Sequence, residues 1–183
     1  PLIVMISTSL KSLEEIRQGS LLSLPQSVTF DAWAKAWSEA CVGVRCNGLA
    51  PYVWNSVLMT APAVFISTLL GAMNGYALTK WRFRGADTIF ALMLFGAFIP
   101  FQVILLPMAR MLGLMGLAGT IPGLIFVHTV YGLAFTTLFF RNFFMGVSDG
   151  IIQAAKVDGA SFFGIFFRLV LPMSLPAIVV TVI

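Results

Sequence analysis

The chain of 183 residues is strongly apolar, with 59% hydrophobic and only 10% charged residues. A soluble domain normally carries about 25% charged residues, so this composition excludes an ordinary water-soluble fold and predicts a protein surrounded by membrane lipid. The net charge of +4 does not indicate nucleic-acid binding, because the basic residues stand at the ends of apolar runs instead of forming an extended patch.

Both ends of the chain are apolar runs, whereas residues 11–52 form its longest polar region. We expect residues 1–10 and 169–183 to be parts of truncated membrane helices, because a complete crossing needs about 20 apolar residues. Residues 11–52 are predicted to form an extramembrane loop. The two tryptophans of that loop recur at helical spacing, which predicts a short amphipathic helix over residues 30–40, lying on the membrane surface or on the bundle.

The only two cysteines, Cys41 and Cys46, lie close together in this loop. A local disulfide could form between them if the loop is periplasmic, but the closed ring would be small, and spacing alone leaves the pairing open. A metal site is not expected, because two thiols and the single histidine, His128, cannot complete the four ligands of a structural zinc ion.

Long apolar stretches follow the loop and predict an all-α fold, a polytopic bundle of transmembrane helices. A small-residue pair, Gly71 and Gly75, stands where two helices could approach closely. The predicted membrane core covers residues 53–183, with complete spans at 53–79, 88–109 and 120–140 and a truncated span at 169–183.

Few polar side chains interrupt these spans. Asn74 could line a solute path, although a hydrogen bond between helices explains it equally well. The second span contains Pro100, Gln102 and Pro107, so we expect a kink whose freed carbonyl groups could serve a solute path. A kink that serves packing alone is the competing account, and His128 is expected to be an ordinary hydrogen-bonded residue of the bundle.

The density of basic residues predicts which side of the membrane each loop faces. Lys80, Arg82 and Arg84 crowd a short loop, which is typical of the cytoplasmic side. Residues 141–168 should return to the same side, because two complete spans separate them from this cluster. Residues 11–52 are then periplasmic.

Within residues 141–168, the sequence predicts a short helix, a tight turn and a second helix. Ser148 or Asp149 can cap the first helix. Gly159 accepts the left-handed conformation that ends a helix, and Ser161 can cap the next one. By itself this pattern could be an ordinary amphipathic re-entry into the membrane.

A longer motif extends through this segment and resembles the EAA loop of ABC importer permeases. It differs from the family pattern only in having Gln153 where Glu is usual. Shorter blocks at residues 7–16, 55–56, 75–85, 99–107 and 141–144 are similar to carbohydrate permeases of the maltose and glycerol-phosphate type, with a likeness to glucose or mannose permeases. The motif consists of Gln153, Ala154, Ala155, three further residues, Gly159, nine further residues, Leu169, one residue, Leu171 and Pro172.

The resemblance implies one permease subunit of a type I importer in a bacterial inner membrane, taking up a sugar. Its partners would be a second permease subunit, an ATP-binding cassette subunit and a periplasmic solute-binding protein. The motif would dock in a groove of the ATPase, with Ala154, Ala155 and Gly159 at the turn. Residues Leu169, Leu171 and Pro172 would set the angle of the next span.

The usual glutamate can form an ion pair with the ATPase, whereas Gln153 offers only neutral hydrogen bonds, about half as strong. Another residue, such as Asp158, could supply the charge. The sequence contains no GxxxxGK[ST] loop to cradle phosphates, so we expect no enzyme activity and no cofactor in this chain. ATP and Mg would bind to the partner ATPase.

Two other classes of protein fit less well. A self-contained secondary transporter or channel would use charged residues inside the membrane, yet the three complete spans contain no Asp, Glu, Lys or Arg. An intramembrane enzyme would need a catalytic cluster, and His128 has no carboxylate nearby in the sequence.

Overall fold

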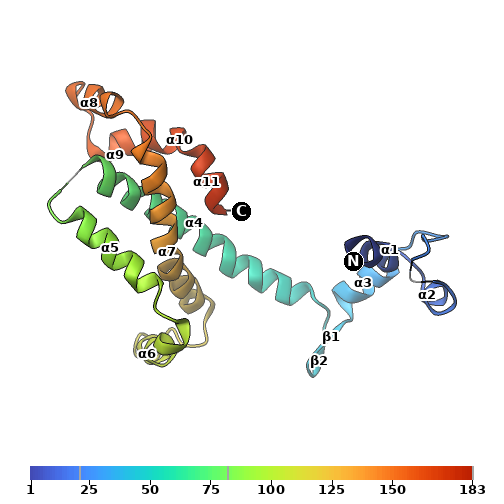
Figure 1. Ribbon diagram of the computed structural model, residues 1–183. Helices are drawn as coiled ribbons and strands as arrows, with labels where there is room; N and C mark the ends of the chain where they lie inside the picture. Colours follow the sequence, from blue (N-terminus) through green and yellow to red (C-terminus); the bar gives the residue numbers. More distant parts are fainter. Residues whose placement is uncertain (21, 82, 183) are drawn as a thin grey trace. The chain divides into compact units, whose positions relative to one another are not determined.

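The computed structural model describes residues 1–20, 22–81 and 83–182 and is almost entirely helical, which confirms the predicted all-α fold (Figure 1). Its helices are α1 (Leu2–Ser9), α2 (Leu13–Gln18), α3 (Asp31–Ser38), α4 (Ala50–Lys80), α5 (Ala86–Ala97), α6 (Phe101–Leu114), α7 (Ile121–Met145), α8 (Asp149–Val157), α9 (Phe162–Ile165), α10 (Leu171–Met173) and α11 (Leu175–Val182). A π-helical turn, η1 (Phe166–Val170), joins α9 to α10, and two short strands, β1 (Cys41–Val42) and β2 (Arg45–Cys46), pair in antiparallel fashion.

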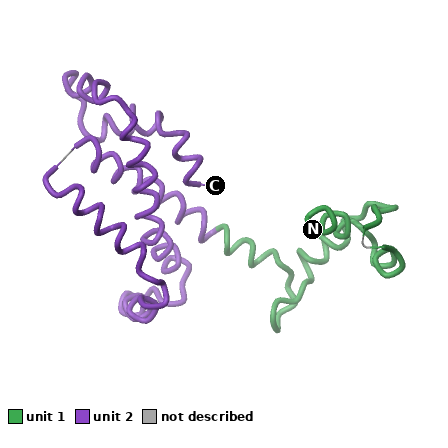
Figure 2. Tube along the Cα trace, in the orientation of Figure 1, with its two compact units in different colours: residues 1–57 green, residues 58–183 purple. Residues whose placement is uncertain are grey.

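The chain divides into two compact units, residues 1–57 and residues 58–183, and the division falls inside α4 (Figure 2). In the first unit the amphipathic helix expected over residues 30–40 is α3. The Lys11 side chain is buried there, and its Nζ atom donates a hydrogen bond of 3.0 Å to Ser23 Oγ. A disulfide joins Cys41 to Cys46 across β1 and β2.

Two helices, α4 and α7, are each long and apolar enough to cross a membrane. They correspond to the spans expected at residues 53–79 and 120–140. The helix α4 extends beyond its expected span at both ends, and α7 extends beyond its expected span at the carboxyl-terminal end. Pro62 lies inside α4. The residue just before α7, Thr120, caps this helix, because its Oγ1 atom accepts a hydrogen bond from the N–H of Gly123. This cap satisfies one of the free amides of the first turn.

The span expected at residues 88–109 is broken. Its two parts, α5 and α6, meet at an angle of 98°. The break falls at Pro100, because proline has no N–H to continue the helical ladder and its ring disfavours a helical conformation in the residue before it. The second proline, Pro107, lies inside α6 without ending it. The sequence therefore predicts a bend here, and the structure contains a complete interruption.

The last segment also differs from expectation. Its helix begins at Phe162, well before residue 169, and continues through η1 and α10 to Met173. The following helix, α11, is bent from it by 70°. Pro172 and Pro176 flank this bend, and each lacks the N–H that would bind the carbonyl four residues earlier. Together with α5 and α6, these bent pairs give the described residues two to four candidate membrane spans.

The core of the second unit forms where α4 meets α7. A methyl group at Gly75 would lie 2.8 Å from Phe140 Cβ, so the two backbones approach more closely than a larger residue would permit. Gly71 faces Thr136 in the same way, which confirms the close approach that this glycine pair predicts. The largest fully buried side chains around this contact include Tyr76, Phe140, Phe144, Ile165 and Phe166.

Candidate docking loop

The segment that follows α7 has the predicted form of helix, turn and helix. Ser148 Oγ accepts a hydrogen bond of 3.2 Å from the N–H of Gly150 at the start of α8. Gly159 adopts a left-handed conformation with φ of 77° just after α8 ends, and Ser161 Oγ accepts a hydrogen bond of 3.2 Å from the N–H of Gly164 in α9. These local contacts confirm the caps and the glycine turn that the sequence predicts.

The helix α8 has one buried side and one exposed side. Ile152 and Ala155 are 2% and 8% exposed and belong to the same core as the buried residues of α4 and α7. Gln153, Ala154 and Asp158 are exposed. Of the two alanines that sequence analysis placed at the docking turn, only Ala154 is open to a partner surface, because Ala155 points into the protein itself. The docking role of the motif stays a prediction.

An aromatic cluster lies beneath the loop and was missed by sequence analysis. It consists of Tyr76 and Trp81 at the end of the first span and Phe162 in α9. The ring centroid of Phe162 lies 4.9 Å from that of Tyr76 and 5.1 Å from that of Trp81. From α8, Lys156 Nζ lies 4.6 Å from the centre of the same Trp81 ring, within the range of a cation–π interaction.

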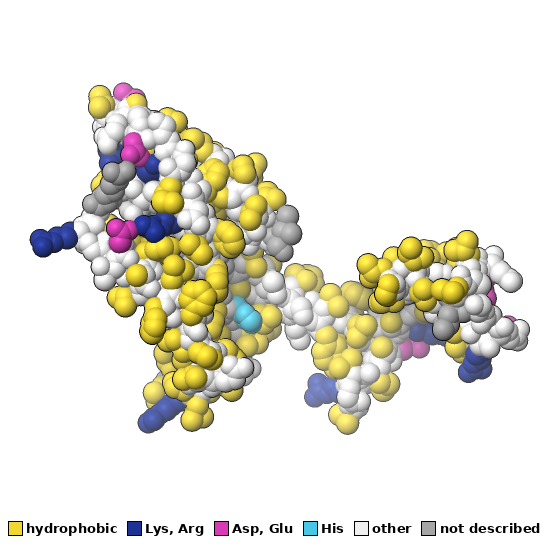
Figure 3. All heavy atoms as spheres, viewed as in Figure 1, with side chains coloured by type: hydrophobic (Ala, Val, Ile, Leu, Met, Phe, Trp, Pro, Cys, Tyr) yellow, Lys and Arg dark blue, Asp and Glu magenta, His cyan; other side chains and the backbone are white. Residues whose placement is uncertain are grey.

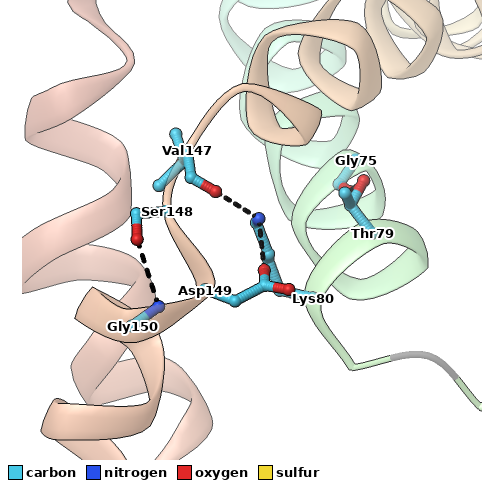
Figure 4. Close-up of polar contacts among 7 residues, drawn as sticks. All are labelled: Gly75, Thr79, Lys80, Val147, Ser148, Asp149 and Gly150. Carbon is cyan, nitrogen blue, oxygen red and sulfur yellow. Dashed lines mark hydrogen bonds and ion pairs between the residues drawn. The ribbon is translucent and has the colours of Figure 1, made fainter.

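An ion pair connects the loop to the first span (Figure 4). Lys80 Nζ donates hydrogen bonds to Asp149 Oδ1 at 2.6 Å and to the backbone oxygen of Val147 at 2.5 Å. The Lys80 side chain is only 5% exposed, whereas that of Asp149 is 53% exposed. Because Asp149 lies in the first turn of α8, its negative charge also interacts favourably with the helix dipole.

A second ion pair holds α5 against α7 near the same end of the bundle. Arg141 Nη2 lies 2.6 Å from Asp87 Oδ1, and the guanidinium carbon of Arg141 lies 4.1 Å from the centre of the Phe90 ring. Of the three basic residues that predict the orientation, Lys80 therefore also makes a specific contact with another segment, whereas Arg82 lies outside the described residues.

The carboxyl-terminal half of the motif lies on the helix that leaves the loop. Leu169 and Leu171 are partly buried against the core, whereas Pro172 is exposed. The bend that follows is centred near Ser174, a fully buried residue whose Oγ donates a hydrogen bond of 2.7 Å to the backbone oxygen of Leu171. The change of direction thus comes after Pro172 and not at it.

The two predicted path residues are not brought to one site. Asn74 is half-buried on α4, and Gln102 is exposed on α6. Neither lines the groove of about 480 Å³ that lies between α4, α7 and α11. Their role in a path therefore stays a prediction. Among the residues that the structure describes, no group of three His, Cys, Asp or Glu side chains could hold a metal ion.

Long apolar helices, two bent helical pairs and an amphipathic helix fixed to the bundle define a polytopic helical membrane protein. The chain belongs to the family described as binding-protein-dependent transport system inner membrane component, which matches residues 52–183. This confirms the resemblance to ABC importer permeases on which the docking motif was assigned.

Three relatives illustrate the similarity. The chain is 35% identical to the diacetylchitobiose uptake system permease protein of Streptomyces coelicolor, over 96% of this chain and 56% of the relative. It is 31% identical to the arabinooligosaccharides transport system permease protein of Halalkalibacterium halodurans, over 97% and 62%. It is 30% identical to the glucose import system permease protein of Saccharolobus solfataricus, over 100% and 63%. The chain thus spans about six-tenths of the length of these relatives.

Proposed function

We propose that the protein is a permease subunit of an ATP-driven importer for a sugar, and that α8 docks on a cytoplasmic ATP-binding cassette subunit. One observation carries the proposal: α8 exposes Gln153, Ala154 and Asp158 while Ile152 and Ala155 of the same helix are fixed in the core of the bundle. A helix of this kind can bind a partner on one side and move the bundle with the other.

The contacts of α8 suggest how movement would reach the membrane. The ion pair of Lys80 with Asp149 joins the first turn of α8 to the end of α4, and Ile152 packs in the core that α4 and α7 share. A displacement of α8 by the ATPase would therefore act on both helices together. Because a packed core resists deformation, we expect the bundle to rotate as a body between two access states.

The proposed assembly contains a second permease subunit and a periplasmic solute-binding protein, and it lies in a bacterial inner membrane. ATP and Mg would bind to the ATPase subunit. Residues 11–52 would then face the periplasm, and α8 the cytoplasm. The family description, which names a binding-protein-dependent system, and relatives named for the uptake of sugars support this assignment.

Purification from native membranes tests the assembly. We expect the tagged protein to bring with it an ATPase subunit and a second permease, identified by mass spectrometry. The variant Gly159→Arg should lose the ATPase and retain the second permease. Recovery of the protein alone, under conditions that preserve known membrane complexes, would contradict the proposal.

A matched control separates docking from backbone strain. Gly116 has a φ of 69°, close to the 77° of Gly159, and neither glycine has an atom within 4 Å of the position a Cβ would take. Placing a side chain in this conformation costs about 1–2 kcal/mol at either site. Gly116→Arg should therefore carry the same strain and keep the ATPase. Equal loss in both variants would contradict the docking assignment.

The sugar is identified by uptake into membrane vesicles that contain ATP. Labelled neutral monosaccharides and oligosaccharides are offered together with the solute-binding protein, and we expect accumulation of one class only. Uptake that depends on an ion gradient and not on ATP would identify a secondary transporter instead.

A further inference from the structure

The proposed docking of α8 gives no role to the residues that line the groove between α4, α7 and α11. Its volume of about 480 Å³ lies in the range of ligand sites, which hold about 300–1,000 Å³. Every lining residue belongs to the second unit, and none is Asp, Glu, Lys or Arg. The side chains used below are Thr60, Ser67, His128, Phe135, Thr136 and Thr181.

His128 is exposed in this groove although it lies within a membrane span. It is the eighth residue of the 25-residue helix α7, which places it about 10 Å along an axis of about 37 Å. Polar side chains at such depths almost always face a protein interior or a water-filled cavity. Figure 3 shows the single histidine, in cyan, at the surface of the second unit. Among the described residues, none makes a hydrogen bond to its ring, so both nitrogens remain available.

The hydroxyl groups of the groove are arranged as acceptors. Thr136 Oγ1 donates to the backbone oxygen of Ser67 at 3.0 Å, and Thr181 Oγ1 donates to that of Ala177 at 3.0 Å. Ser67 Oγ donates in the same way to Val64 at 3.2 Å. Because each of these hydroxyl protons is directed to the backbone, the oxygens can only accept further hydrogen bonds. Ser67 and Thr136 are 6% and 8% exposed and form the wall of the groove, so the hydroxyl groups that a ligand can reach are those of the partly exposed Thr181 and the exposed Thr60.

An aromatic ring completes the lining. Phe135 is 44% exposed and lies on α7 two turns beyond His128, on the same side of the helix. The groove therefore combines an apolar surface with hydroxyl acceptors and one imidazole, and it offers no charge to an ion. This combination fits a neutral solute that carries many hydroxyl groups and an apolar ring face.

We propose that this groove contacts the transported solute, a neutral polyhydroxylated molecule, and that His128 is a specificity-determining hydrogen-bonding residue. The inference rests on the proposed importer function. The groove runs from the contact of Thr136 with Ser67 toward His128 and Thr181, away from the end of α7 that leads to α8. The solute would therefore meet these residues on the side of the membrane opposite the docking helix.

Water access is tested first, and it needs no transport. The two native cysteines are joined in a disulfide, so His128→Cys introduces the only free thiol of this chain. We expect it to react with a charged, membrane-impermeant methanethiosulfonate reagent in the assembled complex. The control is Phe126→Cys, on the same helix and 38% exposed, but outside the groove. An unreactive His128→Cys would mean that lipid or a partner subunit covers the groove, and would overturn the proposal.

Solute contact is tested in the vesicle assay with the sugar that the wild-type protein accumulates. Losing one hydrogen bond to the solute should raise the KM for uptake about tenfold in His128→Leu, and His128→Asn should recover part of the loss. The maximal rate and the amount of bound ATPase should stay unchanged. An unchanged KM in His128→Leu would overturn the contact. If the wild-type protein accumulates no sugar, the importer proposal fails by itself, and the thiol reaction still decides whether water reaches the groove.

Discussion

Lys80 Nζ lies 2.6 Å from Asp149 Oδ1, so a buried ammonium at the end of α4 is paired with the first residue of α8. The two residues are far apart in the sequence, yet their contact joins α8, the proposed docking helix, to a membrane span. A buried lysine needs such partners, because an unpaired charge removed from water is strongly destabilising. The pair therefore fixes where α8 begins relative to the bundle.

We predict that Lys80→Met weakens this connection. The variant loses charged hydrogen bonds to Asp149 and to the Val147 carbonyl, which should cost about 1.5–3 kcal/mol. In the proposed importer, ATP hydrolysis should persist while uptake per ATP falls, because α8 can move without moving α4. The exposed Arg168 provides the control, since Arg168→Met removes a positive charge from the same region. Equal transport efficiency in the two variants would contradict the role of the pair.

The two alanines of the motif should respond differently to a larger side chain. Ala155 is 8% exposed and lies in the core, so Ala155→Leu should destabilise the protein by about 1–3 kcal/mol through overpacking. Ala154 is exposed, and Ala154→Leu should keep the stability of the isolated protein but reduce binding of the ATPase. Thermal unfolding in detergent and copurification distinguish these effects. Normal ATPase binding by Ala154→Leu would show that the partner does not contact this face.

Local features of the site could be read from the sequence, whereas its contacts could not. Ser148, Gly159 and Ser161 act on the backbone within a few residues, and such preferences hold wherever the segment lies. The burial of Ala155 depends on how α8 rotates against helices distant in the sequence. The contact of Lys80 with Asp149 depends on the same packing. The sequence around a basic residue does not indicate which acidic residue it will contact.

The bends illustrate the same distinction. Pro100 predicts an irregularity, because its missing N–H is a property of one residue. Whether the helix kinks or breaks by 98° depends on what the two parts then pack against. The 70° bend beyond Pro172 was missed, although Pro176, four residues later, offered a signal that the membrane helix could not be regular there.

The disulfide leads to a prediction about thiols. Cys41 and Cys46 are bonded to each other and are the only cysteines of the chain. The denatured chain should therefore show no reactive thiol before reduction and two afterwards. Titration with a thiol reagent in denaturant measures this, with Cys41→Ser as the control that should show one thiol without reduction. Two reactive thiols in the unreduced chain would contradict the bond.

The close contact of α4 with α7 leads to the prediction that alanine raises the stability of the protein at one glycine and lowers it at another. Alanine in a helix normally stabilises by about 0.5–1 kcal/mol relative to glycine. This gain should appear in Gly113→Ala, because a Cβ atom there meets nothing within 4 Å. In Gly75→Ala, the new methyl group would lie 2.8 Å from Arg141 N and from Phe140 Cβ. Both contacts involve backbone or Cβ atoms, which cannot rotate away.

Gly75→Ala should therefore separate the two helices and destabilise the protein by about 1–3 kcal/mol in spite of the better helix propensity. Thermal midpoints of the two variants in one detergent compare the effects directly. A rise in both midpoints would show that α4 and α7 are not in contact at Gly75. A fall for Gly75→Ala alone would establish that this glycine sets the distance between the two spans, and with it the position of Tyr76 and Lys80 beneath the docking helix.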